Sequence, residues 1–400
     1  MLRSSKACLK VVDLKRFEGW SGSLLGQRWV LQGLPYSQLE CGRLLIRVVA
    51  LSLVAIGVFA LIQSASRHFL AHDLRYVGMG GVELCGIGQG RVACFMIHDR
   101  VSLGGALVAI GVLYLWLEQE PLKRGESWAW WTFLWAGIFG FGSFFAYQGY
   151  GYLDAWHGLA SLSLLPLYLG GLTMTRAVLS GKRRPLGPLG SLKPAWQDRL
   201  VLGRLLLLMT SLGLIAGGTT IMAIGATWVF VPQDLRYLRL GASDLIAINR
   251  HLVPLIAHDR ASFGGAVATA GVLLCCCILF GRTSCCLWRA ISAAGGVGFF
   301  TAIIIHPIIG YTDFSHLAPA YAGAVAFCLG IALCHAPMCR SNLQRVTFRE
   351  ERTASLIVQA TRCLAIHRES HEQVLSTGSD ALLQPPSITA PGTPGRSLPG

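Results

Sequence analysis

Two stretches of the chain carry the same ionisable side chains in the same order. These are His98, Asp99 and Arg100 in the first stretch and His258, Asp259 and Arg260 in the second. Over the sixteen residues that start at each histidine, ten are identical. An imidazole, a carboxylate and a guanidinium held together can move a proton, bind a metal ion or hold an anion. Such groups are costly near hydrocarbon, so their presence in both stretches predicts a function.

Two further polar elements recur at almost the same distance along the chain. The segment Asp73-Leu74-Arg75-Tyr76 recurs as Asp234-Leu235-Arg236-Tyr237, and the pair Asp154 and His157 recurs as Asp313 and His316. The offsets lie between 159 and 161 residues. A steady offset of this kind predicts a tandem duplication of a whole structural unit.

We expect the recurring groups to form one polar site or two related sites. The candidate site residues are His98, Asp99, Arg100, Asp154, His157, His258, Asp259, Arg260, Asp313 and His316. The candidate metal ligands are His98, His157, His258 and His316. Imidazole and carboxylate groups suit a divalent metal, and histidines at helix ends can also ligate a haem. The spacing between the histidines is long and specifies neither cofactor.

Each of these residues also has a purely structural interpretation. Asp99 and Asp259 precede apolar runs, where a carboxylate can cap a helix N-terminus. Arg100 and Arg260 can extend to lipid headgroups, and the Gly-Gly pairs that begin at Gly104 and Gly264 suit close helix packing. Capping, however, requires neither the histidine nor the arginine of each stretch, so the functional interpretation is favoured.

Composition identifies the setting of these groups. Hydrophobic residues make up 53% of the 400 residues and charged residues only 14%, and the mean hydropathy is +0.53. A soluble domain carries about 25% charged residues. The chain is therefore expected to be an all-α, polytopic integral membrane protein. Eight apolar runs are long enough to span a bilayer: 44–64, 101–117, 128–147, 155–176, 203–226, 261–281, 288–309 and 315–337.

The eight runs fall into two sets of four. The predicted organisation is a basic N-terminal tail (1–43), a first four-helix repeat (44–176), a linker (177–202), a second four-helix repeat (203–337) and a C-terminal tail (338–400), disordered after about residue 376. Four crossings per repeat give both halves the same orientation. A pseudo-two-fold axis along the membrane normal is then expected.

Orientation follows from the positions of lysine and arginine. With the N-terminus in the cytosol, the cytosolic segments hold 26 of the 34 basic residues, as the positive-inside rule requires. Both termini are then cytosolic, and the recurring polar elements lie on the outward face. The net charge of +14 is explained by topology, so nucleic-acid binding is not favoured.

The two halves also differ. His306 lies at the outward end of the seventh run, where the first half has Tyr147 and Gln148, and a lone histidine there is expected to be a packed side chain. Cys85 and Cys94 occur only in the first outward loop. The sequence is compatible with a disulfide between these two cysteines and equally with two free thiols.

Two classes of function remain, with a third behind them. The first is a membrane-embedded catalyst or metal-binding protein whose outward site binds a small or anionic substrate. The second is a transporter of a small solute, a class in which parallel repeats are common. Clustering of the polar groups at the outer ends of the helices favours the first class. A non-catalytic membrane subunit or receptor is the third. The bilayer and a small-molecule ligand are the expected partners.

Overall fold

The computed structural model describes residues 36–146, 152, 155–180 and 198–340. Within these ranges every regular element is a helix, which confirms the all-α prediction. All the described residues up to Cys339 belong to one compact unit. The predicted disordered tail after residue 376 lies outside the described residues.

Eight long helices coincide with the eight predicted runs. They are α1 (Tyr36–Ala65), α4 (Arg91–Leu117), α5 (Ser127–Ala146), α6 (Ala155–Thr175), α7 (Arg199–Gly225), α10 (Leu252–Phe280), α11 (Cys285–Ile309) and α12 (Phe314–His335). Among the described residues, seven helical segments are long and apolar enough to cross a membrane, and α5 is not one of them. The chain is thus an integral multi-pass membrane protein with seven candidate spans, and an eighth span stays a prediction.

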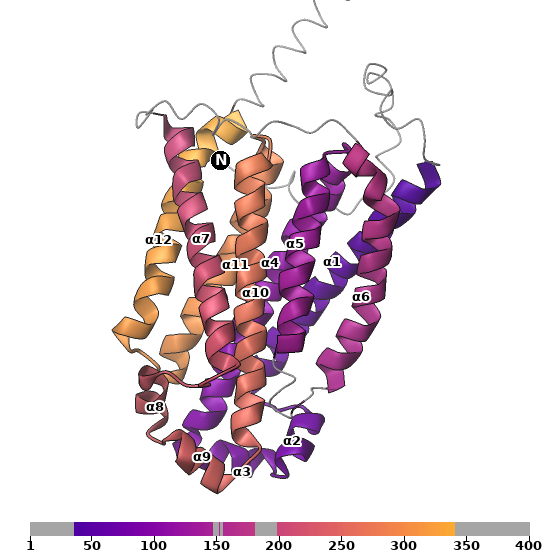
Figure 1. The fold of residues 1–400 in the computed structure, drawn as a ribbon. Coiled ribbons are helices and arrows are strands. Elements are labelled where there is room, and N and C mark those ends of the chain that lie inside the picture. Colours follow the sequence, from indigo (N-terminus) through magenta and orange to yellow (C-terminus); the bar gives the residue numbers. More distant parts are fainter. Residues whose placement is uncertain (1–35, 147–151, 153–154, 181–197, 341–400) are drawn as a thin grey trace, which may run out of the picture. The chain divides into compact units, whose positions relative to one another are not determined.

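Four short helices lie together at one end of the bundle: α2 (Ala71–Val77), α3 (Gly81–Gly86), α8 (Pro232–Leu238) and α9 (Ala242–Ile248) (Figure 1). We call this the α2/α8 end. Here α4 begins at Arg91 and α10 at Leu252, about nine residues before the apolar runs at 101 and 261. Asp99 and Asp259 therefore lie inside helices, and the interpretation of these two residues as N-caps is wrong. Within the helices these carboxylates face arginines of the other central helix: Asp259 faces Arg100 and Asp99 faces Arg260.

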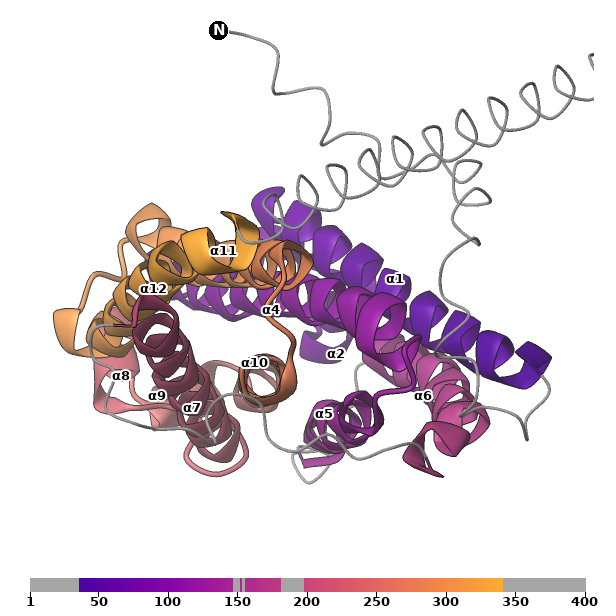
Figure 2. The same ribbon diagram turned by 90° about the horizontal axis from the view of Figure 1, so that it is seen from above.

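The long helices form two rings that share α4 and α10, which pack against each other. The first ring consists of α1, α4, α10, α5 and α6, and the second ring consists of α7, α10, α4, α11 and α12. In each ring every helix contacts the next, as seen along the bundle in Figure 2. Each central helix therefore contacts helices from both halves of the chain.

Small residues allow the closest helix contacts. A Cβ atom at Gly104 of α4 would lie 2.9 Å from the carbonyl oxygen of Gly57 in α1. A Cβ atom at Gly264 of α10 would lie 2.7 Å from the carbonyl oxygen of Gly218 in α7. Both distances are too short for a real side chain, so glycine is required where these backbones touch. The predicted packing role of these two glycines is confirmed.

Candidate functional site

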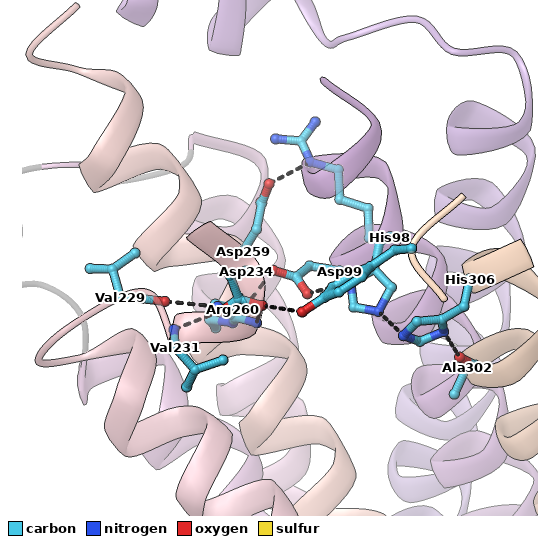
Figure 3. A network of polar contacts seen from close by, with 11 residues as sticks. His98, Asp99, Val229, Val231, Asp234, Asp259, Arg260, Ala302 and His306 are labelled. Atoms are coloured by element: carbon cyan, nitrogen blue, oxygen red, sulfur yellow. Dashed lines mark hydrogen bonds and ion pairs between the residues drawn. The ribbon is translucent and has the colours of Figure 1, made fainter. Parts of the chain in front are cut away.

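Three histidines from three helices of the second ring meet at the α2/α8 end. His98 comes from α4, His306 from α11 and His316 from α12, and one ring nitrogen of each lies within 4.8 Å of the other two. His98 and His306 are 3% and 5% exposed. Their Nε2 atoms are 3.0 Å apart (Figure 3). We call these three residues the histidine triad.

Hydrogen bonds at the opposite ring atoms determine the state of two of these imidazoles. Nδ1 of His98 lies 2.9 Å from the Asp99 carboxylate, and Nδ1 of His306 lies 2.8 Å from the carbonyl oxygen of Ala302. Carboxylates and carbonyls accept hydrogen bonds, so each Nδ1 carries the proton and donates it. In the neutral rings both Nε2 atoms then present lone pairs to each other. Only a shared proton or a metal ion between them makes that arrangement favourable.

The triad fits a small tetrahedral ion. Histidine nitrogens about 2.0–2.1 Å from a zinc ion are roughly 3.3 Å apart, close to the spacing of His98 and His306. A ring nitrogen of His316 lies within 4.8 Å of the other two and is available as a third ligand. The Asp99 carboxylate and the Ala302 carbonyl, which hold the Nδ1 atoms, are the usual outer partners of metal-bound imidazoles. A haem between His98 and His306 does not fit, because two nitrogens 3.0 Å apart leave no room for its plane.

The first ring holds a histidine pair at the same end. Nδ1 of His157 in α6 lies 2.7 Å from Nε2 of His258 in α10, and the Tyr152 ring packs edge-on against His258 with centroids 5.2 Å apart. One proton between these two nitrogens makes an ordinary hydrogen bond between two neutral rings.

Between the two histidine clusters, ion pairs join the two halves. The Arg100 guanidinium donates to Asp259 through Nε at 2.8 Å and to Asp73 of α2 at 2.7 Å. The Tyr152 hydroxyl donates to the other oxygen of Asp73 at 2.6 Å. The arginine of the first stretch is thus bound by the aspartate of the second.

Arg260 has a matching set of partners. Its guanidinium donates to both carboxylate oxygens of Asp234 in α8 and, at 2.8 Å, to the carbonyl oxygen of Val229. The Tyr311 hydroxyl donates to Asp234 at 2.8 Å, and Asp99 lies 3.9 Å from Nε of Arg260 (Figure 3). The aspartate of the first stretch therefore faces the arginine of the second.

The two carboxylates in the short helices stay ionised in this setting. Burial opposes ionisation of Asp73, but the charge of Arg100 and the Tyr152 hydroxyl outweigh it, so the pKa of Asp73 falls below its usual value. The same balance with Arg260 and Tyr311 lowers the pKa of Asp234. Burial and the neighbouring Asp234 raise the pKa of Tyr311, which keeps its hydroxyl a donor.

The structure separates the predicted site residues. His98, Asp99, Arg100, Asp259 and Arg260 lie in or beside the network between the halves. His157 and His258 form the separate pair, so the four predicted metal ligands divide between two clusters. His316 joins the triad. Asp154 lies outside the described residues.

Asp313 has a structural position in the described chain. Its carboxylate accepts from the backbone N–H of His316 at the start of α12 and pairs with Arg236 at 2.9 Å. Hydrogen bonds from Ser315 and Arg236 lower the pKa of Asp313 to about 2. These contacts are those of a helix N-cap.

His306 belongs to the triad, although from the sequence it was expected to be a packed side chain outside the site. The one available signal was that His306 has no histidine counterpart in the first half. Asp73 and Asp234 were visible as recurring residues, but nothing in the sequence joined them to the arginines. Cys85 and Cys94 are both free, so the structure contains no disulfide between them.

Each ring encloses a cavity beside its histidines. The cavity in the second ring, about 650 Å³, is lined by the whole triad and by Arg260 and Ser102. The cavity in the first ring, about 130 Å³, is lined by His157 and Ser262. We call the larger one the second-ring chamber.

Comparisons of this chain with protein-family models, with curated proteins and with solved structures find no match.

Proposed function

We propose that this protein is a metal-dependent integral membrane enzyme in which the histidine triad binds a divalent transition-metal ion beside the second-ring chamber. The observation that carries the proposal is the pair of opposed Nε2 atoms of His98 and His306, 3.0 Å apart with both Nδ1 protons already donated elsewhere. Such a pair is a preformed cation site.

Three histidine ligands leave a coordination position open. An ion in such a site acts as a Lewis acid and lowers the pKa of a bound water molecule toward about 7. Because the triad lines the second-ring chamber, a bound ion would border space for a substrate, and Arg260 in the same wall can contact an anionic group. Metal-assisted attack of water on a polarised carbonyl or phosphoryl group is the reaction class that suits these parts.

We also infer that the two halves arose by duplication. The support is that equivalent residues make equivalent contacts. Arg100 with Asp73 matches Arg260 with Asp234, and the indole N–H of Trp130 donates to the carbonyl of Leu172 as that of Trp288 donates to Ile331.

The α2/α8 end is assigned to the non-cytosolic side in this proposal. The opposite connections hold most of the lysine and arginine residues, which favours both termini in the cytosol.

Metal analysis tests the proposal directly. Purified protein loaded with Zn²⁺ or Co²⁺ and then desalted is expected to keep one ion per chain, and bound Co²⁺ is expected to show the visible absorption of a tetrahedral site. The His306→Ala variant is expected to lose the ion. His157→Ala, which changes a histidine at the same end of the first ring, is the matched control and is expected to keep it. Equal metal content in all three proteins would overturn the proposal.

One observation favours a second candidate function, transport of a small solute. The second-ring chamber extends well away from the triad, as far as Met209 of α7 and Leu274 of α10, whereas a purely surface site would end near the triad. In liposomes, solute flux that is lost in Asp99→Asn while metal binding persists would support the transporter.

A further inference from the structure

The second-ring chamber has two chemically different ends. At the α2/α8 end its wall contains the triad, Arg260 and the Ser102 hydroxyl. Ser102 is 2% exposed, and among the described residues its Oγ has no hydrogen-bond partner. A buried hydroxyl without a partner is destabilising, and a polar group of a ligand in the chamber would remove that cost.

Beyond this end the wall is apolar. It is made by side chains such as Leu214 of α7, Val267 of α10, Phe299 of α11 and Phe327 of α12. Along α12 the lining runs from His316 to Phe327, about 16 Å at about 1.5 Å per residue. One leaflet of a bilayer contributes about half of the roughly 30 Å of hydrocarbon, so this apolar part is about as long as one lipid chain.

Glycines in the wall keep the chamber open, because they carry no side chain to fill it. Gly217 of α7 lines it, and a Cβ atom built there meets no atom within 4 Å. Gly298 of α11 also lines it, and its Cβ would meet only Ala109, at 3.9 Å. At the matching positions of the first ring, Ile56 replaces Gly217 and Leu164 replaces Gly323. The space is thus specific to the second ring.

From this geometry we infer that the second-ring chamber binds a single-chain amphiphile, with an oxyanion headgroup at the triad and Arg260 and its hydrocarbon chain among the apolar residues. The volume, about 650 Å³, is within the roughly 300–1,000 Å³ typical of small-molecule sites. This inference rests on the proposed function in one respect only: it names the substrate class of the same site.

Photolabelling tests the inference. Full-length protein in lipid nanodiscs is irradiated with palmitate that carries a diazirine at the chain end, and the labelled residues are mapped by mass spectrometry. Label is expected on chamber residues such as Leu214 and Phe327. Unlabelled palmitate is expected to compete, and the corresponding uncharged alcohol is not.

Variants with a large side chain inside the chamber give the decisive test. Gly217→Phe and Gly298→Phe are expected to abolish labelling inside the chamber. Gly296→Phe, on the same helix as Gly298, is the control, because Gly296 is exposed, has open space at its Cβ and does not line the chamber. It is expected to label as the parent does.

The outcomes separate this inference from the proposed function. Parent-like chamber labelling in both filled variants, label confined to lipid-facing residues, or equal competition by the alcohol would each overturn the inference, whatever the metal content. Labelling that follows the expected pattern in a parent that binds no metal would leave the inference standing and remove the metal site.

Discussion

The two rings share their central helices and yet differ in what they enclose. The histidine cluster of the first ring has two members beside a cavity of about 130 Å³, whereas that of the second ring has three members beside a cavity of about 650 Å³. In the first ring Tyr114 and Tyr168 fill space and contact each other through their hydroxyls at 3.2 Å. Leu274 and Phe327 stand at the matching positions.

This comparison separates the conserved geometry from the specialised one. Each central arginine pairs with the aspartate of a short helix in its own half. Between the halves, Arg100 donates to Asp259 at 2.8 Å, whereas Asp99 lies 3.9 Å from Arg260, so the direct link between α4 and α10 is mainly the Arg100–Asp259 pair. Side-chain volume and one added histidine distinguish the rings, and for this reason the proposed chemistry is assigned to the second ring.

Removing either central arginine should have the largest effect on stability. Arg260→Met leaves the buried carboxylate of Asp234 without its main partner, and Arg100→Met leaves Asp73 and Asp259 unpaired. Each change is expected to lower the free energy of unfolding by about 3–5 kcal/mol, measured in mixed detergent micelles. A loss confined to one of the two variants would show that the ion pairs are not equivalent between the rings.

Glycines at the ring contacts come next. In Gly265→Ala the new Cβ meets the side chain of Ser143, and in Gly105→Ala it meets that of Thr301. Overpacking is expected to cost about 1–3 kcal/mol in each ring.

Double-mutant cycles check the cause. Adding Ser143→Gly to the first variant and Thr301→Gly to the second is expected to recover part of the loss, since the steric contact is gone. Strictly additive effects would contradict the steric explanation.

Acid is expected to lower the stability of the folded protein through a carboxylate beside each ring. The pKa values of Asp73 and Asp234 are lowered in the folded protein. Their ionisation therefore contributes stability above the unfolded value, about 3.9, and that stability is lost as pH falls from there through the folded values. Unfolding temperature measured against pH is expected to fall over this range, and less steeply in Asp73→Asn and in Asp234→Asn. An unchanged slope in either variant would contradict the assignment.

The smallest effect on stability is expected from a change in the side chains that fill the first ring. Tyr114→Phe removes the hydroxyl contact with Tyr168 but keeps the ring volume. We expect a loss of about 1 kcal/mol in unfolding free energy and unchanged metal content, because the triad lies in the other ring. A change in metal content would show that metal binding at the triad depends on packing in the first ring.

Sequence alone determined the class of this protein and its recurring polar residues. Composition and the length of the apolar runs dictate membrane-spanning helices, because a bilayer forces backbone groups to bond within each segment. Identical residues at offsets of 159 to 161 pointed to His98, Asp99, Arg100 and their counterparts, because such repetition is visible without coordinates.

Tertiary structure decided which of these groups meet. The sequence did not reveal that Arg100 pairs with Asp259, nor that His98 of α4 joins His306 and His316 from the other half. These contacts depend on how α4 and α10 pack against helices more than a hundred residues away, and packing is set by the shapes of many side chains at once. The triad therefore exists only in the folded chain.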